Sequence, residues 1–156
     1  MNLVVIVSMV LLILFDQATK ILAVRTLGSG MDLYWWKDVF HLHYISNYGA
    51  AWGIFSGKQM FLIVLTLLII LGMFYYMLRL PQTKWGKWSQ LAFILMISGA
   101  IGNLIDRIQL GYVRDFLYFI LIDFPIFNVA DILVVCGVGL LIITLFIGEH
   151  EEEKEV

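Results

Sequence analysis

Four long apolar stretches alternate with shorter polar connections along the chain, and this pattern predicts four membrane-spanning helices. We expect the spans at about residues 3–27, 60–80, 88–107 and 128–147. A run of about 20 predominantly apolar residues is enough for an α-helix to cross the hydrocarbon core of a bilayer. The pattern therefore predicts an all-α integral membrane protein with a single polytopic domain over residues 1–156.

The two longer connections, at about 28–58 and 108–127, have a different pattern. Residues 39–45 are rich in strand formers, with His41 and His43 on one face and apolar side chains on the other, as in a half-buried strand. We expect both histidines to be exposed. The first connection contains several aromatic residues of the kind that favour the membrane interface: Tyr34, Trp35, Trp36, Tyr48, Trp52 and Phe55. Together the two connections are expected to form a small β-rich cradle on the bilayer surface.

The distribution of basic residues predicts the orientation in the membrane. The short connection between the second and third spans is flanked or occupied by Arg79, Lys84 and Lys87. Short loops rich in Lys and Arg remain on the cytoplasmic side. Four spans place both termini on that same side, so we expect cytoplasmic termini, an acidic cytoplasmic tail at 149–156 and an extracytoplasmic cradle.

Composition agrees with a membrane protein and excludes other classes. The chain is 62% hydrophobic and only 14% charged, whereas soluble domains carry about 25% charged residues. A net charge of −2 gives no basic surface for nucleic acid. The single cysteine, Cys136, lies in an apolar run, where we expect it to pack rather than react.

Polar residues interrupt the apolar spans at one end only. With the orientation above, the polar clusters at the span ends all fall at the outer leaflet, where Asp16 and Lys20 share a helix face as an i,i+4 pair. Charged groups beside a bilayer are costly and mark candidate functional sites. The clustered residues are Asp16, Lys20, Asn103, Asp106, Arg107, Asn128 and Asp131, with Asn47, Gly49 and Asp115 in the connections.

Asp115 and Asp131 are the pair with the clearest chemistry. Two carboxylates held close together cannot both ionise easily, so the pair is expected to share a proton. The ionised member can activate water while the protonated member donates to a carbonyl oxygen or a leaving amine. Two other readings stay open on the residues alone. One is a small transporter, although transporters usually place charges near the bilayer midplane. The other is a membrane adaptor, which would tolerate Asp→Asn replacement at both positions.

Four ordered blocks carry a resemblance to a known family. They are Asp16-Gln17-x-x-Lys20, Asn47-x-Gly49-Ala50-Ala51, the block from Gly99 through Asn103 to Asp106-Arg107, and Val113-x-Asp115-Phe116 with Phe127-Asn128-x-Ala130-Asp131. In these blocks the sequence resembles the lipoprotein signal peptidases (signal peptidase II). It departs from the usual pattern at Ser98, where glycine is common, and at Arg114, where an apolar or small residue is usual.

The resemblance implies a function and a set of site residues. It implies a bacterial cytoplasmic-membrane aspartic endopeptidase that removes signal peptides from diacylglyceryl-modified prolipoproteins by cleaving just before the lipidated Cys. Asp115 and Asp131 would be the catalytic dyad at the outer leaflet. Substrate-binding or supporting positions would be Asp16, Lys20, Asn47, Gly49, Asn103, Asp106, Arg107 and Asn128. The expected partners are the prolipoprotein and membrane lipid; we expect a monomer with no cofactor, metal or nucleic acid.

Overall fold

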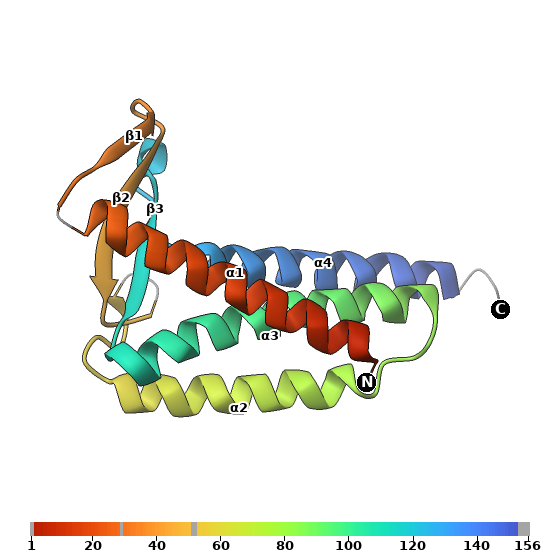
Figure 1. Cartoon of the computed structure of the whole chain (residues 1–156). Coiled ribbons are helices and arrows are strands. Elements are labelled where there is room, and N and C mark those ends of the chain that lie inside the picture. The colour runs from red at the N-terminus through yellow and green to blue at the C-terminus, as the bar shows by residue number, and fades with distance from the viewer. Residues whose placement is uncertain (1, 29, 51–52, 153–156) are drawn as a thin grey trace.

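The computed structural model describes residues 2–28, 30–50 and 53–152 and consists of four long helices with a small sheet at one end (Figure 1). The helices are α1 (Leu3–Leu27), α2 (Gln59–Met77), α3 (Lys84–Leu110) and α4 (Val129–Glu152). Each contains a segment long and apolar enough to cross a membrane. The expected fold class, four membrane helices with a small β-rich part, is confirmed. The last residues of the expected acidic tail, 153–156, lie outside the described residues.

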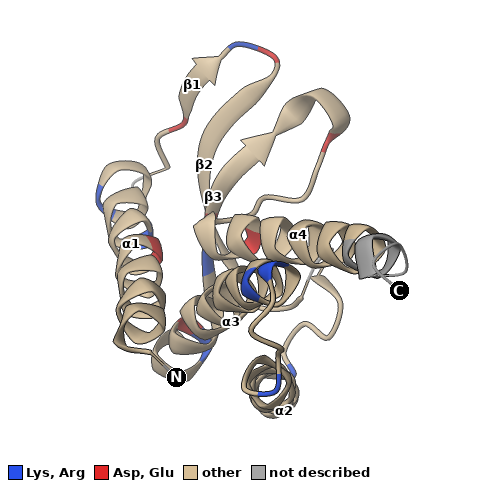
Figure 2. Ribbon diagram, turned by 90° about the vertical axis from the view of Figure 1, so that its right-hand side faces the viewer, with Lys and Arg blue, Asp and Glu red and all other residues tan. Residues whose placement is uncertain are grey.

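Helix α3 is the centre of the bundle. It contacts α1, α2 and α4, and the view along the bundle places it between them (Figure 2). Half of its apolar window is buried, against 11–22% for the other three helices, so those helices leave most of their apolar surface exposed. Small residues allow α4 to approach α3 closely, because a Cβ at Gly99 would collide with the backbone carbonyl of Ala130.

Helix α3 is longer than the expected span at both ends. It begins at Lys84 because the Thr83 hydroxyl accepts a hydrogen bond from the Gly86 N–H at 3.1 Å and caps the first turn. It ends at Leu110 because Gly111 takes a left-handed conformation with φ of 77°. The polar residues near position 106 therefore belong to a continuous helix.

The sheet is antiparallel, in the order β1 (Leu33–Trp36), β2 (Phe40–Asn47) and β3 (Val113–Phe119). A single 3₁₀ turn, η2 (Ile120–Ile122), follows β3. Strand β2 matches the alternating pattern at 39–45 and extends two residues further. Strand β3 joins the second long connection to the first, so the two connections form one sheet.

The two histidines of β2 have different environments, and the expectation that both are exposed is wrong for His41. His41 is paired in register with Tyr34 of β1 and Tyr118 of β3. Its ring lies edge-on to both tyrosine rings and is 8% exposed, because a central strand is covered from both sides. His43 remains accessible and contacts Asp32 through Nδ1 at 2.5 Å.

Candidate active site

The chain between β3 and α4 brings Asp115 and Asp131 to one place. Phe127 folds back on β3, where its N–H donates to the Leu117 carbonyl at 3.0 Å and its carbonyl accepts the N–H of Phe116 at 2.9 Å. Helix α4 starts two residues later. Asp115 on β3 and Asp131 in the first turn of α4 consequently line the same cavity.

Asn128 and Asp131 form a reciprocal cap at the start of α4. The Asn128 N–H donates to Asp131 Oδ2 at 3.0 Å, and the Asp131 N–H donates to Asn128 Oδ1 at 3.2 Å. This pattern satisfies two amide groups that a helix start otherwise leaves without partners. It also fixes the direction of the Asp131 carboxylate, so the cap has a consequence for the site.

A chain of amide side chains connects the two carboxylates. Asn128 Nδ2 donates to Asp115 Oδ1 at 2.6 Å and to Asn103 Oδ1 at 3.0 Å. Asn103 Nδ2 in turn donates to Asp131 Oδ1 at 2.8 Å. Asn47 supplies a further donor to Asp115 Oδ2 at 2.8 Å. Residues from β2, α3, β3 and α4 thus hold both carboxylates in defined orientations.

Burial controls the ionisation of Asp115, whose side chain is 2% exposed. Loss of solvation raises the pKa of Asp115 to about 6, and the neighbouring Asp131 carboxylate adds to the rise. Hydrogen bonds from Asn47 and Asn128 act in the opposite direction because they stabilise the charged form. The site therefore favours a protonated Asp115 far more than water does.

A buried ion pair lies behind the amide chain. Lys20 Nζ and Asp16 Oδ2 are 2.9 Å apart, and neither side chain is exposed, so the expected i,i+4 pair is present. Lys20 also donates to Asn103 Oδ1 at 2.8 Å and lies 3.7 Å from Asp106. Asp16 Oδ1 accepts the Ala130 N–H at 2.9 Å. The pair connects α1 to both helices that carry the site.

Arg107 and Gly49 fix the loop after β2. Arg107 Nη2 donates to the Gly49 carbonyl at 3.1 Å, and the Gly49 N–H donates to Asn47 Oδ1 at 2.9 Å. A Cβ at Gly49 would lie 2.8 Å from the backbone of Gly53, so only glycine fits this close approach. All ten residues singled out in the sequence meet at the sheet end of the bundle. Ala51 and Trp52 of the same loop lie outside the described residues.

Two participants, Gln17 and Arg114, received no role from the sequence. Gln17 Nε2 donates to the Gly102 carbonyl at 3.0 Å and to Asp106 Oδ1 at 3.2 Å. Arg114 forms a salt bridge with Asp106 at 2.6 Å. The available signal was the strand pattern of β3, in which two adjacent charged residues must point to opposite faces. Ser98, the other departure, is buried, and its hydroxyl has no hydrogen-bond partner among the described residues.

The carboxylates open into a cavity of about 690 Å³ with mostly apolar walls. The segment 124–127 and the part of α4 after Asp131 supply most of the apolar lining, and the polar lining comes from Asn47, Asn103, Arg107, Asp115 and Asp131. Cys136 is exposed and lines this cavity from the apolar part of α4. Among the described residues, no group of three side chains could hold a metal ion.

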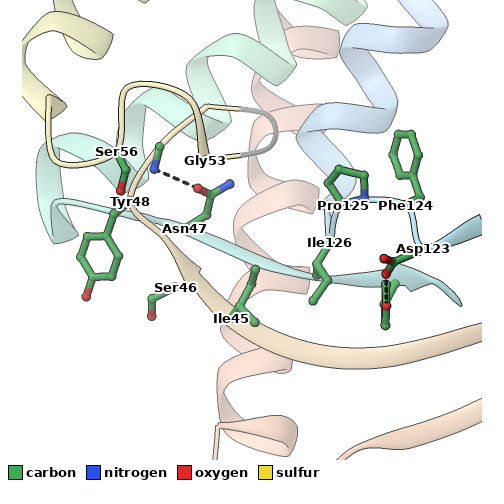
Figure 3. Close-up of a pocket in the computed structure, with 12 residues that line it drawn as sticks. Ile45, Ser46, Asn47, Tyr48, Gly53, Ser56, Asp123, Phe124, Pro125 and Ile126 are labelled. Atoms are coloured by element: carbon green, nitrogen blue, oxygen red, sulfur yellow. Dashed lines mark hydrogen bonds between the residues drawn. The ribbon is translucent and has the colours of Figure 1, made fainter.

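A second cavity of about 520 Å³ lies on the sheet side and shares Asn47 and the segment 124–126 with the first. Its walls come from the end of β2, the following loop and the segment at Asp123–Ile126 (Figure 3). Asp123 accepts a hydrogen bond from the Tyr118 hydroxyl at 2.6 Å at its edge. Asn47 therefore stands between an apolar cavity beside the helices and a more polar one beside the sheet.

Comparison with known proteins gives consistent matches over nearly the whole chain. A family model described as signal peptidase (SPase) II matches residues 8–147. The lipoprotein signal peptidase of Clostridium tetani is 45% identical over 154 residues, which are 97% of each chain. That of Streptococcus pyogenes serotype M5 is 40% identical over 141 residues, covering 90% of this chain and 91% of the relative.

Solved structures agree with these sequence matches. Two structures of bacterial membrane enzymes, determined by the in meso method at 2.3 and 1.9 Å resolution, each superimpose with a TM-score of 0.79. The first is 34% identical and covers 92% of this chain and 87% of its own. The second is 35% identical and covers 91% of this chain and 92% of its own.

Proposed function

Because this chain belongs to the signal peptidase II family of bacterial membrane aspartic endopeptidases, we propose that it cleaves diacylglyceryl-modified prolipoproteins just before the lipidated Cys. Asp115 and Asp131 are the catalytic dyad in this proposal. The supporting residues are Asp16, Lys20, Asn47, Gly49, Asn103, Asp106, Arg107 and Asn128. The whole chain, residues 1–156, acts as a single polytopic domain and as a monomer.

The observation that carries the proposal is the amide chain that joins the two carboxylates across one cavity. Asn128 contacts Asp115, Asn103 contacts Asp131, and the two asparagines contact each other. If these carboxylates only capped a helix, a hydrogen-bonded link from Asp131 in α4 to Asp115 in β3 would not be needed. The arrangement supports a pair that acts together on a substrate in the cavity.

The chemistry follows from the shared proton. The ionised carboxylate removes a proton from water, and the resulting hydroxide adds to the carbonyl carbon of the scissile bond. The protonated carboxyl donates to the carbonyl oxygen, which gives a neutral tetrahedral intermediate. The pKa of about 6 for Asp115 supports a proton-donating member at mildly acidic to neutral pH. Collapse of the intermediate breaks the C–N bond, and the amine of the lipidated Cys leaves with a proton from the dyad.

The shape of the site supports a substrate that arrives from the membrane. Apolar residues of α4 line the cavity next to Asp131, and two of them, Ile132 and Val135, are exposed. A signal helix and acyl chains are apolar and match such a lining. The backbone beyond the cleaved bond is polar and would continue into the cavity beside the sheet.

The same proposal includes an orientation. The α2–α3 connection lies at the end of the bundle with both termini, opposite the sheet (Figure 1). The basic residues near that connection favour the cytoplasmic side. Both termini then face the cytoplasm, and the dyad lies at the outer leaflet, where the lipidated Cys of a prolipoprotein is found.

The decisive test compares the purified wild-type protein with Asp115→Asn and Asp131→Asn. A diacylglyceryl-modified prolipoprotein in detergent is the substrate, and the released signal peptide is measured by mass spectrometry with EDTA present throughout. We expect cleavage by the wild type before the lipidated Cys and none by either variant. The unmodified prolipoprotein is the matched substrate control and is expected to remain uncut.

Each alternative outcome contradicts a different part of the proposal. Activity in either well-folded Asn variant would refute the dyad. Cleavage of the unmodified substrate at the same rate would refute recognition of the lipid. Loss of wild-type activity in EDTA that returns with added metal would refute a dyad that works without a metal.

A further inference from the structure

Arg114 lies immediately before Asp115 in β3 and is 9% exposed. Among the described residues that line the two cavities above, Arg114 is absent. Its side chain therefore does not contact a substrate held in either cavity. Arginine is rarely buried unless it is paired. The partners that hold Arg114 in the interior therefore explain its position.

The contacts of Arg114 tie β3 to two helices. Its guanidinium donates to both carboxylate oxygens of Asp106 in α3, from Nη2 at 2.6 Å and from Nε at 3.0 Å. Nη2 also donates to Gln17 Oε1 in α1 at 2.8 Å. Such a two-point contact between guanidinium and carboxylate fixes direction as well as distance. The strand is thus attached to the bundle at the residue that precedes Asp115.

The backbone takes part in the same anchor. The Arg114 N–H donates to Asp106 Oδ2 at 3.0 Å, so one carboxylate holds both the side chain and the main chain. Adjacent strand residues point to opposite faces. Holding Arg114 on the Asp106 face therefore sets the rotation of the strand that turns Asp115 towards Asn47 and Asn128.

The strand pairing is irregular next to Asp115. The pairing of β2 with β3 is regular from Phe40 to Leu42 and from Ile45 to Asn47, but the register shifts between Leu42 and Ile45. Asp115 pairs with Ile45, directly beside the irregularity. A bulge interrupts the ladder and bends the strand locally, so the contact with Asp106 adds a constraint on the orientation of β3 beside the irregularity.

The balance of buried charges also indicates a structural role for Arg114. Behind the amide chain lie two buried acids, Asp16 and Asp106, and two buried bases, Lys20 and Arg114. The hydrogen bond with Asp106 raises the pKa of Arg114 above its already high ordinary value, so its charge is permanent. Removal of this cation would leave an uncompensated buried carboxylate beside the dyad.

We propose that Arg114 is a positioning residue for the reaction, which fixes the rotation of β3 through Asp106 and Gln17 and so aims the Asp115 carboxylate. The proposal rests on the proposed function of Asp115. Because Arg114 acts through another residue and lines neither cavity, its removal should change turnover without changing the affinity for substrate.

The test measures kcat and KM separately for Arg114→Met and Arg114→Lys with the lipid-modified prolipoprotein. We expect kcat of Arg114→Met to fall by about tenfold to a hundredfold with KM within about twofold, since misplacing a reacting group by 1 Å costs on the order of a hundredfold. Lysine keeps the charge but lacks the fork, so Arg114→Lys should have a kcat between those of Arg114→Met and the wild type. Arg25→Met, which removes an exposed arginine in the last turn of α1, is the matched control and should retain wild-type kinetics.

The outcomes separate the two proposals. If Arg114→Met does not fold, Arg114→Lys decides, because a wild-type kcat in that variant would overturn the positioning role. A rise in KM with unchanged kcat would also overturn it and indicate substrate binding. Asp115→Asn is assayed in parallel: an active Asp115→Asn refutes the proposed function, whereas an inactive one beside fully active Arg114 variants refutes only the present inference.

Discussion

At the residue scale, Asp115 is the group whose ionisation the structure constrains most. Its pKa of about 6 includes repulsion from an ionised Asp131, so this value describes loss of the last proton shared by the pair. In the proposed mechanism the active form keeps one proton. We therefore expect kcat/KM to decline as pH rises through about 6, measured with the lipid-modified substrate in a series of buffers at constant ionic strength.

Asn47→Ala should move that decline in a known direction. The hydrogen bond from Asn47 stabilises the ionised carboxylate and lowers the pKa of Asp115. Its removal raises the pKa, so the decline in kcat/KM should shift to higher pH than in the wild type. A shift to lower pH would contradict the assignment of the decline to Asp115.

Asn103 offers a second prediction at this scale, because its amide contacts Lys20, Asn128 and Asp131 together. Asn103→Ala removes the link between the two halves of the dyad and leaves the Lys20 ammonium without that acceptor. We expect kcat at saturating substrate to fall by about tenfold or more. Gln109→Ala, at an exposed position of the same helix, is the control; equal kcat values in the two variants would show that the link has no part in turnover.

The sequence predicts contacts between residues that are close together in the chain. It does not predict contacts between residues that are far apart in the chain. Asp16 and Lys20 lie one helical turn apart, so their pairing follows from helix geometry. Gln17 and Arg114 are separated by 97 positions, and only the arrangement of α1, α3 and β3 brings them together. The burial of His41 was missed for the same reason, since it depends on which strands flank β2.

At the scale of elements, the contact between α3 and α4 depends on glycine. Gly99→Ala would place a methyl group against the Ala130 carbonyl, and Ala130 also donates to Asp16. Such overpacking costs about 1–3 kcal/mol, so we expect a lower Tm in detergent, measured by the fluorescence of the native tryptophans.

A matched control lies in α4 itself. A Cβ at Gly139 would meet no atom within 4 Å, and alanine is favoured over glycine in a helix by about 1 kcal/mol. Gly139→Ala should leave the Tm unchanged or raise it slightly. An equal loss of Tm in both variants would indicate a general effect of glycine replacement rather than the contact at Ala130.

Hydropathy predicts the four helices because each must be apolar along a whole span, and this signal is local. The ends of α3 are set instead by the caps at Thr83 and Gly111. Hydropathy alone does not reveal these caps. Strand β3 is harder to predict. It holds two charged residues side by side, and it becomes a strand by pairing with β2, more than 60 residues earlier in the chain.

At the scale of the whole molecule, the proposed orientation predicts which sites a membrane-impermeant thiol reagent reaches. Lys37, in the connection between β1 and β2, and Lys87, at the opposite end of the bundle in α3, are both exposed. In a Cys136→Ala background, Lys37→Cys should be labelled in intact spheroplasts, and Lys87→Cys only after lysis. Mass spectrometry of the purified protein gives the labelled fraction, and the reverse pattern would refute cytoplasmic termini.

The hydrogen bond between Asp16 and the Ala130 amide has a consequence for biosynthesis. These groups are 114 positions apart, which at ribosomal rates corresponds to a delay on the order of 10 s. During that delay Lys20 and Gln17, both in the same helix, are partners already present for the newly inserted Asp16 carboxylate. The remaining partner arrives with the same turn of α4 that delivers Asp131. If Asp115 and Asp131 form the proposed dyad, a nascent chain gains proteolytic activity only after its last span has been synthesised.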